Sequence, residues 1–383
     1  MQNQASSAVG GSGRARAREL GLALGRLAPG PLNAITDVPG VRVGHTTLSW
    51  GEGPLVLGKG PVRTGVTVVV PHEGRLSTDP VYAGYHVLNG NGEMTGLIWL
   101  AESGLLSTPI GLTNTHSVGV ARDALIAYDV THGGPPFLYW WSCPVVAETW
   151  DGLLSDINGQ HVRPEHVFAA LDAADGGPVA EGCVGSGTGM ICHGFKGGIG
   201  TASRLVSEAD GGWIVGALVQ ANHGQRYLLR VDGVPLGRLI PAEAVPLPGP
   251  AQGDGAGSII VVIATNAPLL PGQCRRLAQR ATLGIARTGG LGENSSGDIF
   301  LAFATGNRGL FREPGSRAKL TVQAVADEAL TPLFEAAGEA TEEAIVNALC
   351  AAVTTSGGDG RIAHALPLDR LQEIMGAYRP WAS

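Results

Sequence analysis

The stretch Gly257-Ser258-Ile259-Ile260-Val261-Val262-Ile263 decides the fold of this chain. Its five consecutive β-branched residues, with no polar alternation, predict a strand that is buried on both faces of a sheet. A glycine-rich, charge-poor segment, residues 246–257, comes directly before that strand. The serine at this boundary is therefore held from one side by the strand and approached from the other by a loop that can bend.

The bond between Gly257 and Ser258 is a candidate for self-cleavage. A glycine has no Cβ and can adopt the twisted backbone that lets the neighbouring hydroxyl attack its carbonyl. An N-to-O acyl shift, followed by hydrolysis, would leave Ser258 as a new N-terminus with its α-amine beside its own hydroxyl. Such an amine has an ordinary pKa of about 7.7 to 8.0, so it can act as a base near neutral pH. The alternative is an uncut linker followed by a strand.

Length and composition indicate a folded protein with a large hydrophobic core. The chain has 383 residues, enough for two ordinary domains or one large layered domain. Hydrophobic residues make up 44% and charged residues only 15%, as in a protein that also buries surface in an oligomer. The net charge of -7, without a basic stripe, argues against a nucleic-acid partner.

Cysteine usage and the absence of long apolar runs bear on location. The five cysteines are odd in number, scattered and without a CxxC pair, which suits a reducing cytoplasm. We find no signal peptide and no apolar run long enough to span a membrane. We therefore expect a cytoplasmic protein with no membrane partner.

Strand-like and helix-like patterns alternate along the chain. Short apolar runs predict strands at residues 66–70, 96–100, 213–219 and 298–304. Helical spacing and capping residues predict helices at residues 117–128, between 271 and 287, and from Thr341 onward. This mixture favours layers of helices packed on sheets.

A serine nucleophile needs a group that orients its amine and donors for the oxyanion that forms when it attacks. Asp298 could orient Ser296, and Ser296 could in turn orient the amine or hydroxyl of Ser258. Asn222, at the end of an apolar strand, could supply an amide donor. The alternatives are a serine-rich turn with a strand-edge aspartate, and a turn asparagine.

Other motifs are weaker. Glu148 follows the apolar run 144–147 and can pair with a substrate ammonium, or it can be an ordinary surface charge. The GxGxG at residues 185–189 does not follow a clear strand, so we do not expect a bound nucleotide. The ten histidines show no HExxH and no paired ligand spacing, and Cys192 beside His193 is an isolated pair. We therefore expect no metal and no organic cofactor.

Taken together, these stretches resemble a known family. Over nearly its whole length the chain is similar to the self-processing aminopeptidases that include the L-aminopeptidase/D-amidase/esterases and the β-peptidyl aminopeptidases. The stretches that carry the resemblance are residues 35–44, 89–93, 145–151, 185–200, 219–222, 257–258 and 296–298. The resemblance implies a four-layer αββα sandwich, and a precursor cut into a larger chain, 1–257, and a smaller chain, 258–383. It also implies a homo-oligomer of such pairs, with a tetramer favoured.

The resemblance also assigns roles to single residues. Ser258 matches the N-terminal nucleophile, Ser296 and Asp298 match the pair that supports it, and Asn222 matches the oxyanion-hole asparagine. Glu148 matches the carboxylate that grips the free amine of the substrate. Two residues further on, where the family carries a tyrosine, this chain has Trp150. Indole can donate a hydrogen bond but cannot accept one or ionise as a phenol can, so acyl-chain preference is expected to differ.

The sequence therefore predicts a hydrolase that releases N-terminal residues from short peptides, amides or esters through an acyl-enzyme on Ser258. It leaves open whether the substrate carries an L-, D- or β-amino acid. One alternative is acyl transfer like that of the ornithine acetyltransferases, which have a similar sandwich but a threonine nucleophile. Another is a non-catalytic binding protein of the same fold.

Overall fold

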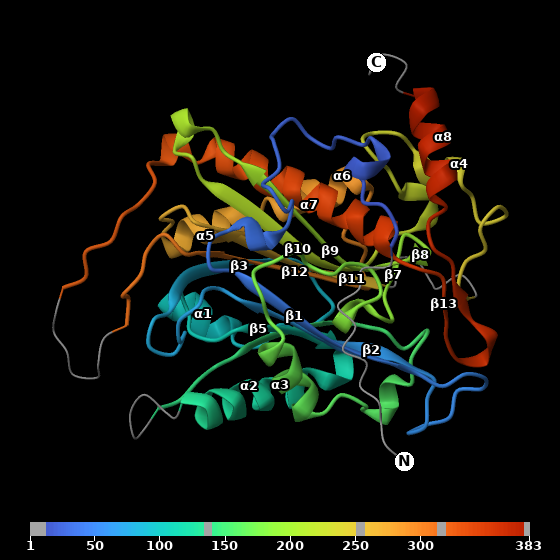
Figure 1. Cartoon of the computed structure of the whole chain (residues 1–383), viewed down its shortest axis with the longest axis horizontal. Coiled ribbons are helices and arrows are strands. Elements are labelled where there is room, and N and C mark those ends of the chain that lie inside the picture. The colour runs from blue at the N-terminus through green and yellow to red at the C-terminus, as the bar shows by residue number, and fades with distance from the viewer. Residues whose placement is uncertain (1–12, 134–139, 250–256, 312–318, 379–383) are drawn as a thin grey trace.

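Two β-sheets lie face to face in the computed structural model, and each is covered on its outer side by helices (Figure 1). The structure describes residues 13–133, 140–249, 257–311 and 319–378. The predicted four-layer αββα sandwich is confirmed. Both the larger and the smaller expected segments contribute strands to it, so residues on either side of the proposed cut share one sheet.

The first sheet has four strands in the order β1-β2-β5-β6. Its strands are antiparallel except for the parallel pair β5 and β6. The apolar side chains on its outer face pack against α2 and α3. The bounds are β1 Arg42–Trp50, β2 Val62–Val70, β5 Ile110–Asn114, β6 Val145–Thr149, α2 Val118–Gly133 and α3 Pro164–Asp172.

The second sheet has six strands in the order β4-β3-β12-β11-β10-β9. β11 and β12 run parallel at its centre, and β10 pairs antiparallel with β11 on the other side. The bounds are β3 Val81–Gly90, β4 Leu105–Leu106, β9 Gly198–Leu205, β10 Ile214–Asn222, β11 Gly257–Thr265 and β12 Ser296–Ala304.

The predicted strand after Ser258 is confirmed as β11, and it is buried on both faces. Ile260 and Val262 face the first sheet, whereas Ile259, Val261 and Ile263 pack toward the outer helices. All five are at most 1% exposed, and full burial of such a side chain is worth about 1.5 to 3 kcal/mol. The burial of these five side chains on both faces of the strand fixes the position of Ser258 at its end.

Helices α5, α6 and α7 cover the outer face of the second sheet (Figure 1). Two short hairpins and three further α-helices complete the α-helices and strands in the described part of the chain. The bounds are α1 Leu97–Ser103, α4 Leu236–Leu239, α5 Pro271–Ala278, α6 Ala281–Thr288, α7 Thr331–Ala351, α8 Leu368–Tyr378, β7 Ile191–Cys192 with β8 Phe195–Lys196, and β13 Thr355–Ser356 with β14 Ile362–Ala363.

Three secondary-structure predictions need correction. The strand predicted at residues 96–100 is wrong, because α1 occupies this segment; a short apolar run does not distinguish the two by periodicity. The helix predicted between residues 271 and 287 is two helices, α5 and α6. The last long helix begins at Thr331 rather than Thr341, because α7 is buried against β9, β10 and α6 and its buried glutamates, which pair with Arg204, interrupt the apolar period.

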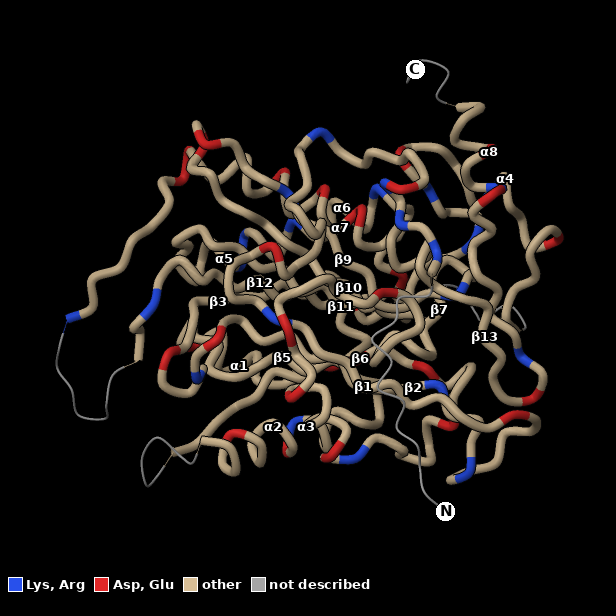
Figure 2. The backbone as a smooth tube through the Cα atoms, in the orientation of Figure 1, with Lys and Arg blue, Asp and Glu red and all other residues tan. Residues whose placement is uncertain are grey.

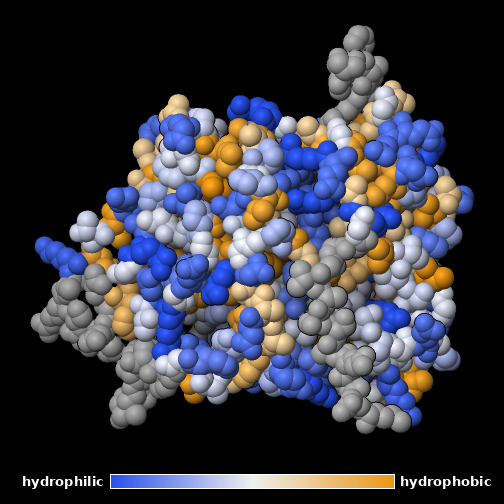
Figure 3. Space-filling model, viewed as in Figure 1, coloured by the Kyte–Doolittle hydropathy of each residue, from blue (hydrophilic) through white to orange (hydrophobic). Residues whose placement is uncertain are grey.

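Charges are mixed over the described surface. Lysine and arginine are interspersed with aspartate and glutamate over the traced backbone (Figure 2). Hydrophobic and hydrophilic residues also alternate over the face drawn in Figure 3. Among the described helices, none combines the length and apolar character needed to cross a membrane.

Candidate active site

Ser258 lies at the meeting point of three strand ends. On one side it stands opposite Asn222 of β10, and on the other it pairs with Gly297 of β12. The N–H of Gly297 donates a hydrogen bond to the Ser258 hydroxyl at 3.1 Å. The serine is only 6% exposed, so its hydroxyl is held in one place by the sheet.

The predicted pair Ser296 and Asp298 flanks Gly297 on β12. The Ser296 hydroxyl donates to Oδ1 of Asp298 at 2.6 Å, and both residues are buried. Burial raises the pKa of Asp298 to about 6, while the Ser296 hydrogen bond and one from the backbone of Ile259 favour the charged form. The carboxylate is therefore tied to the β12 strand end that contacts the candidate nucleophile.

Asn222 has its amide oriented at both ends. Its Oδ1 accepts the N–H of Ile191 at 2.7 Å, and its Nδ2 donates to the carbonyl of Trp150 at 3.0 Å. Only one of the two Nδ2 hydrogens is used in these contacts. The other is available to a negative oxygen that forms beside Ser258, the residue opposite Asn222 in the sheet.

Glu148 projects from β6 of the facing sheet and is 3% exposed, so the surface-charge alternative does not hold. Its Oε1 accepts the N–H of Glu93 at 2.9 Å, and its Oε2 accepts the hydroxyl of Thr115. Burial raises its pKa, and these two donors oppose that shift. A buried carboxylate of this kind gains most from a cationic partner.

Gly92 lies between the Glu148 carboxylate and Gly297, the neighbour of Ser258 in the sheet. A Cβ at this position would lie 3.0 Å from Oε1 of Glu148 and 3.3 Å from Cα of Gly297. A larger residue here would push the Glu148 carboxylate or the β12 strand end aside by a few tenths of an ångström, and glycine avoids that displacement. Sequence reasoning gave the loop between β3 and α1 no role, although the stretch 89–93 was among those that carry the family resemblance.

Trp150 contacts Asn222 through its backbone carbonyl. Its carbonyl accepts the Asn222 amide, whereas the residue as a whole is 41% exposed and its indole packs over Gly152. The side chain is therefore positioned at the rim rather than among the buried polar groups.

Asp151 was missed by sequence reasoning. It is 1% exposed, and its carboxylate accepts the Asn114 amide at 3.0 Å. Burial raises its pKa to about 7, and the nearby charge of Glu148 adds to that shift. A strongly shifted pKa in a buried group beside Glu148 and Trp150 is the signal that marks it, and that signal exists only in the folded chain.

Gly257 lies where two strands approach each other closely. It is part of β11 and does not adopt a left-handed backbone. A Cβ there would lie 2.4 Å from the carbonyl oxygen of Asn222 and 2.9 Å from Cα of His223. The glycine therefore permits a close approach of β10 and β11 at the proposed cut. The rest of the preceding linker, residues 250–256, lies outside the described residues.

One group of side chains in the described part of the chain could hold a metal ion. It consists of Cys192, His193 and His223, and it lies beside Asn222 rather than among the groups that contact Ser258.

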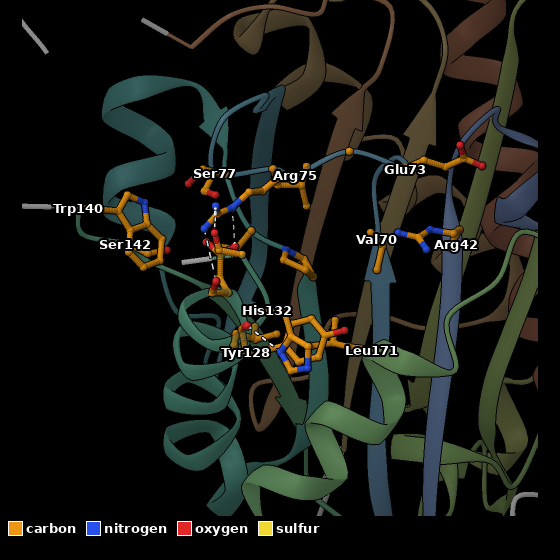
Figure 4. Close-up of a pocket in the computed structure, with 18 residues that line it drawn as sticks. Arg42, Val70, Glu73, Arg75, Ser77, Tyr128, His132, Trp140, Ser142 and Leu171 are labelled. Carbon is orange, nitrogen blue, oxygen red and sulfur yellow. Dashed lines mark hydrogen bonds and ion pairs between the residues drawn. The ribbon is translucent and has the colours of Figure 1, made fainter. Parts of the chain in front are cut away.

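A cavity of about 390 Å³ lies elsewhere, between α2 and the adjoining ends of the first sheet (Figure 4). Arg75 donates to Asp129 at 3.0 Å on one side of it, and Tyr128 stacks on His132 on another. None of the residues predicted to act with Ser258 lines this cavity. Its size alone therefore does not make it the catalytic site.

The layered sheets, the serine at the start of an inner strand and the buried polar groups around it define a hydrolase with an N-terminal nucleophile. Comparison with known proteins agrees. The model of peptidase family S58 matches residues 33–363, and the chain belongs to that family. It is an aminopeptidase, and neither acyl transfer nor a silent binding protein is favoured.

Three relatives illustrate the match. The β-peptidyl aminopeptidase BapA of Sphingosinicella microcystinivorans is 50% identical over 381 residues, which cover 96% of this chain and 93% of the relative. The solved β-aminopeptidase of Burkholderia sp. is 54% identical with a TM-score of 0.88, covering 95% of this chain and 99% of the other. The L-aminopeptidase D-Ala-esterase/amidase of Ochrobactrum anthropi, described as a variant of the Ntn hydrolase fold, is 44% identical with a TM-score of 0.85, covering 95% and 98%.

Proposed function

We propose that this aminopeptidase activates itself by breaking the bond between Gly257 and Ser258. The observation that carries the proposal is the fixed hydroxyl of Ser258, held by the Gly297 N–H at 3.1 Å and opposite Asn222. The hydroxyl attacks the Gly257 carbonyl carbon, and an ester replaces the peptide bond while the Ser258 nitrogen becomes an amine. Water then hydrolyses the ester. The products are the larger chain, residues 1–257, and the smaller chain, residues 258–383.

The same serine then turns over substrate. Its free amine takes the hydroxyl proton as Oγ attacks the substrate carbonyl, and the leaving amine carries a proton away. The free Nδ2 hydrogen of Asn222 stabilises the oxyanion. The ion-dipole pair of Asp298 and Ser296, linked at 2.6 Å, orients the new N-terminus. Water activated by the same amine releases the acyl group.

Glu148 selects substrates with a free amine. A buried carboxylate whose pKa is raised by burial is stabilised when a substrate ammonium enters beside it. Free N-terminal residues are therefore accepted, and blocked ones are rejected. We extend the substrates to β-amino acid residues, because two relatives named for β-peptides or β-amino acids are 50% and 54% identical to this chain.

We also propose an oligomer of cut pairs in the cytoplasm. Large apolar side chains lie exposed on the described surface, among them Ile98 and Trp141, and association would bury them. The five cysteines are all free in the structure, which suits a reducing compartment. A tetramer is the expected size, and light scattering of the purified protein tests it.

A matched pair of substrates tests the activity. Amino acid p-nitroanilides are offered with a free amine and with an N-acetyl group, in L-, D- and β-forms. We expect release of nitroaniline only from free-amine substrates, with the β-form accepted. Equal rates for free and acetylated substrates would contradict the role of Glu148, and no turnover of any form would contradict the activity.

A further inference from the structure

Cys192, His193 and His223 form a compact buried cluster behind the oxyanion asparagine. One ligand atom from each lies within 4.8 Å of the other two, and all three residues are buried. The sequence did not indicate the cluster, because His223 is 31 residues away from Cys192. The N–H of His193 donates to the carbonyl of His223 at 2.7 Å and fixes the two segments together.

His193 is held in a conformation that few side chains adopt. It occupies the tight turn between β7 and β8 with a φ of +49°, and Gly194 follows with +68°. Its ring packs so closely on Gly224 that a Cβ there would lie 2.3 Å from Cε1. Left-handed backbone costs a non-glycine residue of order 1 to 3 kcal/mol, and such costs gather at functional sites.

The hydrogen bonds of His193 prepare it as a metal ligand. Its Nδ1 lies 3.1 Å from the carbonyl oxygen of Gln225, and since a carbonyl can only accept, Nδ1 carries the proton. The lone pair is then on Nε2, which is buried and has no partner among the described residues. A backbone carbonyl that fixes the tautomer in this way is a common outer partner of metal-binding histidines.

The other two residues complete a donor set. Nδ1 of His223 lies 3.8 Å from Sγ of Cys192, so this ring presents Nδ1 to the thiol, and the atom left without a partner among the would-be ligand atoms is Nε2 of His193. Orphaned buried polar atoms are rare in native proteins and call for an explanation. One thiolate and two imidazoles suit Zn²⁺ and similar thiophilic cations, with water as the fourth ligand.

We propose that Cys192, His193 and His223 bind one thiophilic cation, such as Zn²⁺ or Cd²⁺. Coordination replaces the S–H bond of Cys192 by a sulfur–metal bond, and the proton leaves to solvent. With Zn²⁺, bonds of about 2.0 to 2.3 Å draw the ligand atoms to about 3.3 to 3.7 Å from one another. The cluster must therefore contract around the ion.

Contraction of the cluster would displace the neighbouring residue Asn222. Ile191 and Asn222 directly precede Cys192 and His223, and the Ile191 N–H orients the Asn222 amide at 2.7 Å. Moving the two ligand residues together displaces the amide that faces Ser258. The cation is thus an inhibitor, and this consequence rests on the proposed role of Asn222, whereas binding itself does not.

Binding is tested separately from activity. The protein is produced in Cd²⁺-supplemented medium, or incubated at length with Cd²⁺ because the cluster is buried, and is then desalted. We expect one tightly held Cd²⁺ per chain by elemental analysis, an ultraviolet thiolate-to-cadmium band, and a raised melting temperature. Cys192→Ser and His193→Gln should each lose the band and at least tenfold in affinity.

Matched variants decide the outcome. Cys143→Ser removes a free cysteine elsewhere and should retain the ion and the band. Melting of each metal-free variant reports whether it folds. Retention of Cd²⁺ by folded Cys192→Ser and His193→Gln, or no retention by the wild type after either loading route, overturns the site. Stoichiometric binding with unchanged turnover overturns only the inhibitory effect.

Discussion

Ser258 and Asn222 stand directly opposite each other at the paired ends of β11 and β10. The antiparallel register continues for seven further pairs of almost entirely apolar residues, so neither end can slide without moving the whole core. A one-residue slip would turn every side chain of β11 to the other face. The proposed nucleophile and the proposed oxyanion donor are therefore positioned by the same interactions that stabilise the fold.

The oxyanion role of Asn222 predicts a loss in kcat rather than in substrate affinity. Asn222→Ala should lower kcat by about 10²- to 10³-fold with little change in KM, when rates are normalised to the amount of cut chain. Asn307→Ala is the matched control, since Asn307 is also buried and bridges an N–H and a carbonyl of one residue, Gln323. It should cost stability but not kcat. A KM effect alone for Asn222→Ala would move this residue out of the chemistry.

The role of Glu148 predicts a loss of selectivity for the free amine. Glu148→Gln keeps an oxygen for the Glu93 N–H but removes the charge. Removing one partner of a buried ion pair costs about 3 kcal/mol, so kcat/KM for free-amine substrates should fall by about 10²-fold. The rate on acetylated substrates should not fall. Glu93→Gln keeps the backbone N–H that Glu148 accepts and removes only an exposed like charge, so it should stay within about threefold of the wild type.

The close approach at Gly257 predicts that a single methyl group impairs self-cleavage. In Gly257→Ala the Cβ meets the Asn222 carbonyl at 2.4 Å, and the strand ends must move apart. A strain of about 1 to 3 kcal/mol corresponds to slowing by about 5- to 150-fold, measured by gel after expression at several times. Gly272→Ala, whose Cβ meets nothing within 4 Å, should be cut at the normal rate. Normal cutting of Gly257→Ala would show that this contact is irrelevant.

The raised pKa of Asp298 predicts that replacing it stabilises the protein at high pH while abolishing activity. Its folded pKa, about 6, lies above the ordinary value of 3.8, so the folded state binds the proton more tightly. Well below pH 3.8 the carboxyl is protonated in both the folded and the unfolded state, so it adds no charge-related cost to folding. The free-energy cost of burying the carboxylate grows between pH 3.8 and about 6, and above about 6 it is constant. An asparagine side chain cannot ionise, so Asp298→Asn should stabilise the protein at pH 8 relative to pH 5, while activity is lost.

The comparison is made in a Ser258→Ala background, which keeps every sample uncut. Urea unfolding midpoints at pH 5 and pH 8 give the difference in the free energy of unfolding. The whole shift of the pKa corresponds to about 3 kcal/mol, of which roughly half falls between pH 5 and pH 8, less what the partly hydrated carboxylate recovers from solvent. A variant that is less stable at pH 8 than at pH 5, relative to its parent, would show that Asp298 is stabilised as an anion.

Much of this site could be predicted from the sequence, and the reasons are local. The unbroken run after Ser258 predicts a doubly buried strand by itself, because all five of its residues are β-branched and it carries no polar face. The polar residues 296–298 and Asn222 could be placed at strand ends for the same reason. The family resemblance supplied the grouping, and the register of β10, β11 and β12 brings these residues together.

The remainder depends on packing between distant segments. Gly92 matters only because Glu148 and Gly297 approach it from two different sheets, and no local pattern encodes that. The pKa of Asp151 is raised by burial, and burial cannot be read from the sequence. α1 was mistaken for a strand because seven residues give too few turns for a helical period.

The central claim is tested most directly by a denaturing mass spectrum of the purified protein, wild type beside Ser258→Ala. We predict two masses for the wild type, those of residues 1–257 and 258–383, and one uncut mass for the variant. A fully active wild type that remains a single polypeptide, or one cut at another bond, would contradict the claim.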